Sequence, residues 1–262
     1  MTANEDELRT DVPHSARVWN YWLGGEDNFP VDQAVGDAVL AYYPGIATVA
    51  RQAREFLQRA VRLLAGELGV DQFLDVGSGL PTTQNTHQLA QALVPEARVV
   101  YVDHDPLVLA RARTLLTDTS PTGATAYVDA DVRDTERILA EARTVLDFDR
   151  PIAVMFLGIF GYLPDLDEAR AIVRTIMDAV PPGSYLVVRD HTDLDATAGD
   201  ASTDYTESGM APYHLRSVDE LRTFFDGLEL VEPGFVRVAQ WRPDPGETVP
   251  ATADHAGLAR KP

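Results

Sequence analysis

The chain has 262 residues, of which 41 are acidic and 22 basic, so its formal net charge at neutral pH is −19. A protein that wraps duplex nucleic acid needs a basic surface to displace the counterions of the phosphates, and this composition argues against one. The chain has no cysteine, which excludes disulfides, iron–sulfur clusters, thiolate zinc sites and a cysteine nucleophile. We find neither a signal peptide nor an apolar run of the about 20 residues that cross a bilayer, so we expect a cytoplasmic protein without membrane contact.

The first 70 residues precede the predicted sheet, and we expect them to form a helical cap, or lid, on the same domain. Residues 14–43 hold a cluster of aromatic side chains around Gly24-Gly25. The segment from Ala50 to Leu68 is amphipathic, because its apolar residues recur at the spacing of one helix face. Its other face carries four arginines that we predict to be solvated, namely Arg51, Arg54, Arg59 and Arg62.

From about residue 71 onward, short apolar runs alternate with helical patterns. This alternation predicts βαβ units and a parallel sheet with helices on both faces. The predicted strands are Phe73–Val76, Val99–Asp103, Thr125–Val128, Ile152–Leu157 and Tyr185–Arg189. The predicted helices between them are Asn85–Leu93, Leu107–Leu116, Thr135–Leu146 and Leu166–Val180.

The last part of the chain breaks this rhythm. Asp193 to Arg216 is a long insertion that has room for a helix of its own, and a helix is expected at Val218–Phe225. Two further apolar runs, Leu228–Val231 and Phe235–Gln240, are separated by only three residues. A loop this short predicts an antiparallel hairpin, because a parallel crossover needs a dozen residues or more. Residues 244–262 are expected to form a C-terminal tail.

The central motif is the glycine turn that follows the first predicted strand, within Phe73–Thr83. Gly77 and Gly79 let a ligand approach the backbone closely, and the helix that follows offers unpaired N–H groups. The third glycine of a dinucleotide fingerprint is replaced by Thr82. In addition, Asp75 ends the strand, where its carboxylate repels a pyrophosphate and attracts an ammonium group. The turn therefore favours a ligand with a cationic end.

Acidic residues also follow the second and third predicted strands. Asp103 ends the second strand, where a carboxylate accepts hydrogen bonds from both ribose hydroxyls of a bound nucleoside. His104 is then expected beside the adenine, whereas Asp105 precedes a proline and fits the cap of a helix. After the third strand, Asp131 is predicted to accept a bond from the adenine amino group, and the Val132 N–H to donate to a ring nitrogen.

These motifs resemble those of class I methyltransferases that depend on S-adenosylmethionine (SAM), in which Asp-x-Gly-x-Gly is followed by two further acidic strand ends. The predicted layout, a Rossmann-like sheet of seven strands with five parallel and a C-terminal antiparallel hairpin, is similar to theirs. Longer stretches resemble one narrower family of S-adenosyl methyltransferases (family 19 type), formerly catalogued as a domain of unknown function. They are Ala16–Phe29, Gly79–Thr82, Asn85–His87 and Gly227–Gly234.

This resemblance implies that SAM is the cofactor and S-adenosylhomocysteine (SAH) the product, with residues 71–243 as the catalytic core. In the cap, Arg17 is expected to meet the SAM carboxylate and Tyr21 to line the pocket. Ser78 in the glycine turn and Phe156 at the end of the fourth strand complete the candidate cofactor residues.

The methyl acceptor is expected to be a small organic molecule, methylated on oxygen, nitrogen or a carboxyl group. The segment after the fourth strand is apolar and aromatic, and lacks the Asn/Asp-Pro-Pro-aromatic signature of amino methyltransferases that act on exocyclic groups. If a base is needed, His191 after the fifth strand, Tyr162 after the fourth and His214 in the insertion are the candidates. The histidines show no metal-binding spacing, so we predict no metal.

Two other functions remain open on the sequence alone. An NAD(P)-dependent oxidoreductase has a similar sheet, although Thr82 and Asp75 argue against it. A regulatory protein that binds SAM without turnover would keep the same glycine turn and Asp103.

Overall fold

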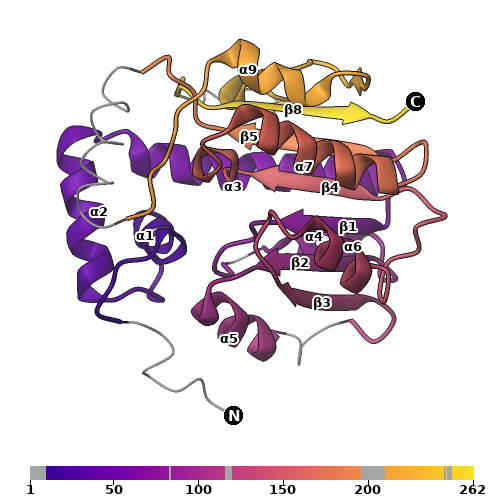
Figure 1. Cartoon of the computed structure of the whole chain (residues 1–262), viewed down its shortest axis with the longest axis horizontal. Helices are drawn as coiled ribbons and strands as arrows, with labels where there is room; N and C mark the ends of the chain where they lie inside the picture. The colour runs from indigo at the N-terminus through magenta and orange to yellow at the C-terminus, as the bar shows by residue number, and fades with distance from the viewer. Residues whose placement is uncertain (1–9, 83, 116–119, 196–209, 245, 247–249) are drawn as a thin grey trace.

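One mixed sheet runs through the centre of the computed structural model, which describes residues 10–82, 84–115, 120–195, 210–244, 246 and 250–262. The strand order is β3-β2-β1-β4-β5-β8-β6, and β7 also pairs with β8 (Figure 1). Five strands are parallel, as predicted: β1 (Gln72–Val76), β2 (Arg98–Asp103), β3 (Ala124–Asp129), β4 (Ala153–Leu157) and β5 (Tyr185–Asp190). The predicted α/β fold is confirmed. The strand order reverses at β1, where open α/β sheets bind their ligands.

The antiparallel part of the sheet is not the hairpin that the sequence predicts. The two late apolar runs contribute only the short strands β6 (Glu229–Leu230) and β7 (Val236–Arg237). Both pair with β8 (His255–Arg260) rather than with each other. The hairpin prediction is therefore wrong, because the chain continues past β7 and returns to place a third strand between β5 and β6.

The strand β8 lies in the segment that we expected to be a tail. All six of its residues pair with β5, from Tyr185↔Arg260 to Asp190↔His255. Its sequence, HAGLAR, contains alanine and glycine, which are poor strand formers, and so gives no local signal. The strand forms because β5 offers a buried partner along its whole length.

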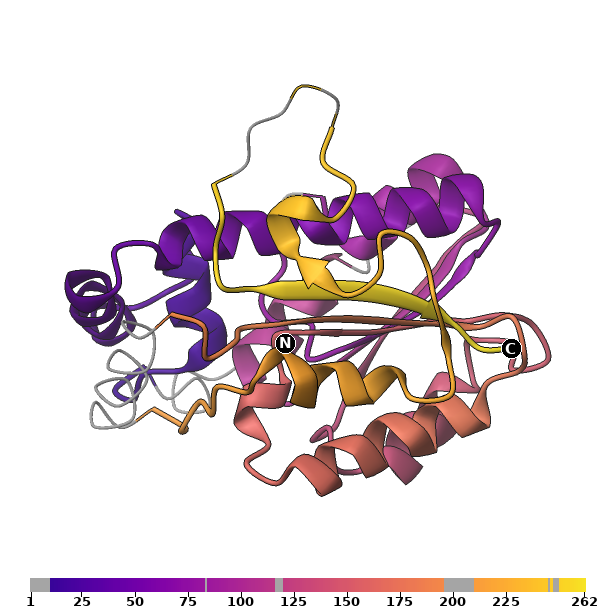
Figure 2. The ribbon, with the colours of Figure 1, turned by 90° about the horizontal axis from the view of Figure 1, so that it is seen from above.

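Helical layers cover both faces of the sheet, as the view from above shows (Figure 2). On one face lie α3 (Ile46–Val61), a π-helical turn at Arg62–Glu67 and α4 (Thr86–Leu93). The other face is covered by α6 (Thr135–Ala142), α7 (Leu166–Ala179) and α9 (Val218–Arg222). Near the end of the glycine turn, α5 (Pro106–Leu115) packs through Leu107 and Val108 against Leu80.

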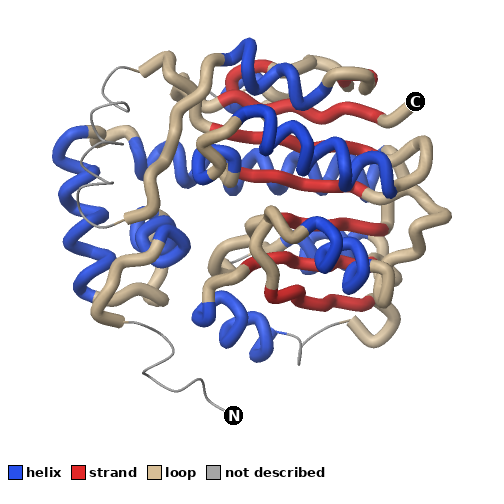
Figure 3. The backbone as a smooth tube through the Cα atoms, viewed as in Figure 1, coloured by secondary structure: helices blue, strands red, loops and turns tan. Residues whose placement is uncertain are grey.

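The cap consists of α1 (Ser15–Trp22) and α2 (Pro30–Tyr42), which lie beyond the carboxyl ends of the parallel strands (Figures 1 and 3). They share an apolar cluster with the start of α3 and with Met210. Asp32 is fully buried in the cap, and its carboxylate accepts hydrogen bonds from the backbone N–H groups of His14 (2.9 Å) and Phe29 (2.9 Å). These bonds fix the segment that leads from residue 14 into α2. Most of the insertion at Asp193–Arg216 lies outside the described residues.

Of the four arginines predicted to be solvated on α3 and the turn after it, Arg59 is buried and Arg54 is half-buried. Arg59 donates hydrogen bonds to the backbone oxygens of Trp241 (2.9 Å) and Val238 (3.0 Å). Arg54 faces the cavity described below, whereas Arg51 and Arg62 are exposed. The long helix α3 therefore touches both the cap and the segment Val238–Trp241 that follows β7. No helix in the described part of the chain combines the length and apolar character that crossing a bilayer needs.

Candidate active site

A cavity of about 410 Å³ lies at the carboxyl ends of the parallel strands, between the sheet and the cap. Its size falls in the range of small-molecule sites. The floor is formed by the ends of β1, β2, β4 and β5 and the loop after β3, and α1 and α3 provide the wall on the cap side. The cavity thus lies where the three predicted acidic strand ends meet.

The glycine turn enters this cavity directly after β1. Gly77 adopts a φ of +76°, and a Cβ at this position would come within 2.5 Å of Cδ1 of Ile159. A larger residue is therefore excluded by both backbone conformation and space. The hydroxyl of Ser78 is buried and has no hydrogen-bond partner among the described residues. An unpaired buried hydroxyl at the cavity wall fits a site that a polar ligand completes.

Asp103 holds the turn and lines the same cavity. Its carboxylate accepts hydrogen bonds from the backbone N–H groups of Gly79 (2.8 Å), His104 (2.8 Å) and Asp105 (3.0 Å). The residue is 9% exposed, and that exposed part faces the cavity. A carboxylate fixed in this way, with remaining acceptor capacity, is suited to a pair of ribose hydroxyls.

Asp75 and Arg54 supply opposite charges to the inner end of the cavity. Asp75 is 4% exposed, and its carboxylate accepts a 2.7 Å hydrogen bond from the hydroxyl of Thr86. Burial raises the pKa of Asp75 to about 6, while the bond from Thr86 and the charge of Arg54 act to lower it. Arg54 donates to the backbone oxygen of Gln84 (3.1 Å) and also lines the cavity. Together they present a carboxylate for an ammonium group and a guanidinium for a carboxylate.

Replacing Asp75 by asparagine is expected to stabilise the ligand-free protein by about 1–2 kcal/mol at pH 7.5. A carboxyl whose pKa is raised in the folded state contributes stability that is complete below its unfolded value and is lost as pH rises through about 6. Asparagine removes this loss and keeps an acceptor for Thr86. Urea unfolding at pH 5 and pH 7.5 should show the larger gain at pH 7.5.

Asp129→Asn is the matched control for this measurement, since Asp129 ends β3 at the same edge of the sheet but is exposed. It should change the free energy of unfolding little at either pH. If Asp75→Asn destabilises the protein at pH 7.5, burial of the ionised carboxylate is not the cost that we infer.

The residues predicted for the adenine lie at the outer end of the cavity. His104, Asp131 and Val132 all line it. His104 and Asp131 are exposed, and Val132 is 8% exposed. The Asp131 carboxylate accepts from the backbone N–H of Arg133 (2.9 Å) and pairs with its guanidinium (3.4 Å). This end of the cavity is therefore open to solvent and polar at its rim.

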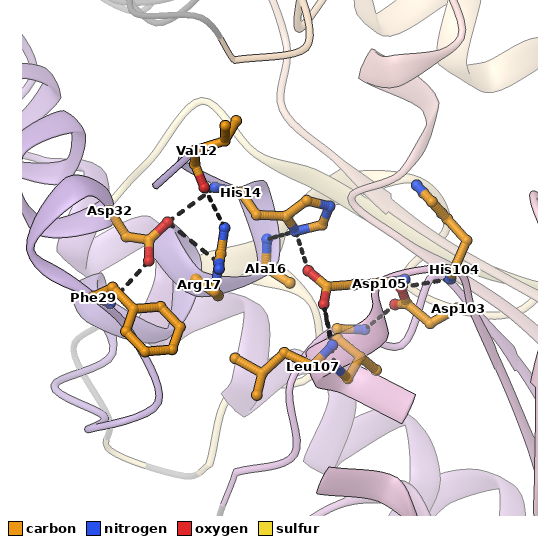
Figure 4. A network of polar contacts seen from close by, with 12 residues as sticks. Val12, His14, Ala16, Arg17, Phe29, Asp32, Asp103, His104, Asp105 and Leu107 are labelled. Carbon is orange, nitrogen blue, oxygen red and sulfur yellow. Dashed lines mark hydrogen bonds and ion pairs between the residues drawn. The ribbon is translucent and has the colours of Figure 1, made fainter. Parts of the chain in front are cut away.

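Three predicted cofactor residues do not line the cavity. Phe156 is fully buried in the core, stacked 5.1 Å from Phe160, because its side chain points to the face of β4 that α6, α7 and α9 cover. Arg17 points into the cap, where its guanidinium pairs with Asp32 (3.3 Å) (Figure 4). Tyr21 packs against Gly36 of α2, and its hydroxyl donates to Asp37 of the same helix (2.7 Å). We correct these three predictions accordingly.

Figure 4 shows instead how the cap is joined to the cofactor strands. His14, which precedes α1, contacts Asp105 after β2 (Nδ1 to Oδ2, 2.5 Å), next to Asp103. Burial raises the pKa of Asp105, but the contacts with His14 and with the N–H of Leu107 outweigh it, and the pKa is lowered overall. A second contact joins Arg111 of α5 to Asp27 of the cap. The cap is thus anchored on the half of the cavity that contains Asp103.

The other half of the cavity, beyond β4 and β5, contains the predicted base candidates. His191 and Tyr162 line it. His214 is exposed and does not line the cavity, and its backbone N–H donates to the oxygen of Gly161 (2.7 Å). Tyr162 packs edge-on against Tyr213, with ring centroids 4.9 Å apart. The Tyr213 hydroxyl donates to Asp190, the last residue of β5. Tyr162 and Tyr213 therefore form an aromatic wall.

His191 is held by partners that sequence reasoning missed. Its Nδ1 contacts the carboxylate of Asp254, which is fully buried just before β8 and also pairs with Arg189. Trp19 of the cap lies against the same guanidinium, 5.2 Å from its central carbon. Neither Arg189 nor Asp254 has a recognisable motif, because they are 65 positions apart and meet only once β8 pairs with β5.

Comparisons with known proteins agree with this geometry. The profile of the S-adenosyl methyltransferase family matches residues 1–262. The chain belongs to this family. A crystal structure of a DUF574 family protein from Streptomyces avermitilis is 41% identical, covers 97% of this chain and 100% of its own, and superposes with a TM-score of 0.92. A candidate methyltransferase from Thermobifida fusca is 40% identical, covers 100% and 99%, and has a TM-score of 0.90.

More distant structures share the fold alone. A SAM-dependent methyltransferase from Methanosarcina mazei is 15% identical over 73% of this chain and 92% of its own, with a TM-score of 0.50. No curated protein matched the chain. The S-adenosyl methyltransferase assignment establishes SAM as the cofactor and methyl transfer as the activity, as the glycine turn and the acidic strand ends predict.

Proposed function

We propose that this S-adenosyl methyltransferase transfers the methyl group to a small organic molecule held between the cap and β5. The observation that carries the proposal is the division of the cavity. One half has the charged groups that suit SAM, and the other is walled by aromatic and apolar side chains, among them Trp19, Tyr43, Met210 and Tyr213. Walls of this kind, with few polar groups, are typical of sites for small organic ligands.

In this proposal SAM is held by the residues of the first half. Asp103 would accept the ribose hydroxyls, and His104, Asp131 and Val132 would surround the adenine. Asp75 would meet the ammonium group, and Arg54 takes the carboxylate role first predicted for Arg17. Bound SAM supplies an activated methyl group on a sulfonium. The protein's own contribution is then to position the acceptor in line with that methyl group and to exclude water.

Calorimetry tests the cofactor half of the proposal. We expect SAM and SAH to bind and NAD not to bind. Arg54→Met should weaken SAH about tenfold or more, because a charged hydrogen bond contributes about 1.5–3 kcal/mol. Arg51→Met is the matched control, since Arg51 lies on the same helix but is exposed and bonded to Thr48 (2.9 Å). Equal losses in both variants would rule out the carboxylate role of Arg54.

The size class of the acceptor is tested with SAM that carries a radioactive methyl group. The protein is incubated with a bacterial extract that has been separated by ultrafiltration into small molecules and macromolecules. We expect label to enter compounds of the small-molecule fraction only. Label in protein or nucleic acid instead would contradict the proposal.

A further inference from the structure

The environment of His191 carries an inference about the chemistry of the acceptor, and it rests on the function proposed above. The residue is 8% exposed and follows β5 at the carboxyl edge of the sheet. Its Nδ1 contacts a carboxylate oxygen of Asp254. Its Nε2 is buried and has no hydrogen-bond partner among the residues that the structure describes. An unpaired ring nitrogen at a cavity wall leaves one polar position for a ligand to fill.

The contact with Asp254 decides whether Nε2 of His191 donates or accepts a hydrogen bond. Arg189 pairs with the other carboxylate oxygen, so the buried Asp254 has a cationic partner and stays ionised. An ionised carboxylate only accepts hydrogen bonds, so Nδ1 of His191 carries the hydrogen. Nε2 of the neutral ring then has a free lone pair. It accepts a hydrogen bond, and the bound molecule must donate one.

The charged groups around His191 interact with other groups of the protein. The groups that face it are Arg189, Asp190 and Asp195 on its own segment, Tyr43 after α2, and Asp254 before β8. Arg189 and Asp254 neutralise each other, and the Asp190 oxygens accept from Tyr213 and from the backbone N–H groups of Phe160 (2.9 Å) and His191 (2.8 Å). The Arg189–Asp254 pair therefore carries no net charge, although the buried Nε of Arg189 has no hydrogen-bond partner among the described residues. Asp195 interacts with the hydroxyl of Tyr43.

The walls beside His191 suit a flat ring. The ring of Tyr43 lies 5.7 Å from that of His191, and burial is the main cause that raises the pKa of Tyr43 to about 12, so it remains a neutral phenol. Trp19 covers Arg189, and the ring of Tyr213 lies over Gly161, where a Cβ would come within 2.3 Å of it. Tyr43 thus packs against His191 directly, and the rings of Trp19 and Tyr213 line the same cavity.

We propose that the methyl acceptor is a neutral aromatic hydroxyl compound, that Nε2 of His191 takes its proton, and that Asp254 is the positioning residue for His191. The hydroxyl oxygen forms the new bond to the methyl carbon while the bond from that carbon to sulfur breaks, with its electron pair left on sulfur. The hydroxyl proton passes to Nε2 and then to water. The products are the methyl ether and the neutral thioether SAH.

A weak base is sufficient for this step. Burial, together with the neighbouring Arg189, lowers the pKa of His191 to about 3, so the ring is neutral at physiological pH. The proton leaves while the new C–O bond forms, when the oxygen is far more acidic than in the free hydroxyl compound. Asp254 then stabilises the imidazolium that is formed.

Nitrogen NMR of the histidine rings in the SAH-bound protein tests the role of Asp254 without any acceptor. We expect His191 to carry its hydrogen on Nδ1 and to stay neutral down to about pH 5, and His191→Phe assigns its signal. A ring with the hydrogen on Nε2 would overturn the proposal, because that nitrogen would have no lone pair for the acceptor proton.

The acceptor class is tested with probes of one shape that differ in one group. The protein with saturating SAH is titrated at about pH 6 with 4-nitrophenol, nitrobenzene, 4-nitrobenzoate and 4-nitrobenzylamine. Binding is followed by quenching of Trp19 and Trp22, which line the cavity. We expect 4-nitrophenol to bind about tenfold more tightly than the other three. Tighter binding of the benzoate or the amine, or no quenching by any probe, would overturn the proposal.

His191→Phe should remove the preference for 4-nitrophenol and leave nitrobenzene binding unchanged. His214→Phe is the matched control, because His214 is exposed and does not line the cavity. Calorimetry with SAH distinguishes a failure of the proposed function from a failure of the acceptor assignment. If SAH does not bind the unaltered protein, the function proposed above fails. If SAH binds but 4-nitrophenol is not preferred, only the acceptor assignment fails.

Discussion

Asp254→Ala is expected to lower the free energy of unfolding by about 3–5 kcal/mol, the largest effect of any single substitution that we predict. The carboxylate is fully buried between Arg189 and His191. Removing it leaves the guanidinium, itself 2% exposed, without its ionic partner in a low-dielectric surrounding. Urea unfolding followed by circular dichroism measures the change.

Glu229→Ala is the matched control. Glu229 lies on β6, and its carboxylate pairs with Arg260 at the far end of β8 (3.4 Å), but both side chains are largely exposed. We expect a change of about 0–1 kcal/mol. The double variant Arg189→Leu, Asp254→Leu should recover most of the loss, because it removes both buried charges. A double variant as unstable as Asp254→Ala would show that packing, rather than an unpaired charge, causes the loss.

Asp103→Ala is expected to weaken SAH binding about 10- to 150-fold, which corresponds to about 1.5–3 kcal/mol. The substitution removes the acceptor for the ribose hydroxyls and also releases the N–H of Gly79, which fixes the glycine turn. Calorimetry on the folded variant measures the affinity. Asp103→Asn keeps one carboxamide oxygen and should lose less.

Asp129→Ala provides the control for this second prediction. Asp129 is the register partner of Asp103 on the neighbouring strand β3, but it is exposed and does not line the cavity. The affinity of the Asp129→Ala variant for SAH should equal that of the unaltered protein. If Asp103→Ala is folded and binds SAH equally well, the ribose does not lie at Asp103.

The parallel half of the sheet could be predicted from the sequence because each strand has its own local signal, even β3, which is only half-buried at the end of the sheet. The acidic strand ends were predictable for a related reason. Carboxyl ends of parallel strands meet at one edge, so Asp75, Asp103 and Asp131 had to lie close together once the strands were found. For this half, local sequence patterns and the rules of sheet topology were enough.

The surroundings of the arginines could not be predicted, because they depend on contacts between distant segments. Helical periodicity shows that Arg54 and Arg59 lie away from the main apolar face of α3, but it does not show what lies opposite. In the structure, Arg54 meets a cavity and Arg59 meets the backbone near Trp241. Arg17 was assigned to SAM because of its place in a family motif, whereas a buried carboxylate, Asp32, binds it within the cap.

The position of β8 also has a consequence for how the protein is made. The glycine turn and the three acidic strand ends are complete once about half of the chain has left the ribosome. The short strands β6 and β7 follow, but each has β8 as its partner, so neither can join the sheet until residues 255–260 are synthesised. Asp254 is synthesised directly before these residues. A nascent chain is therefore expected to acquire its cofactor half early, and the pocket beside His191 only when the last strand is added.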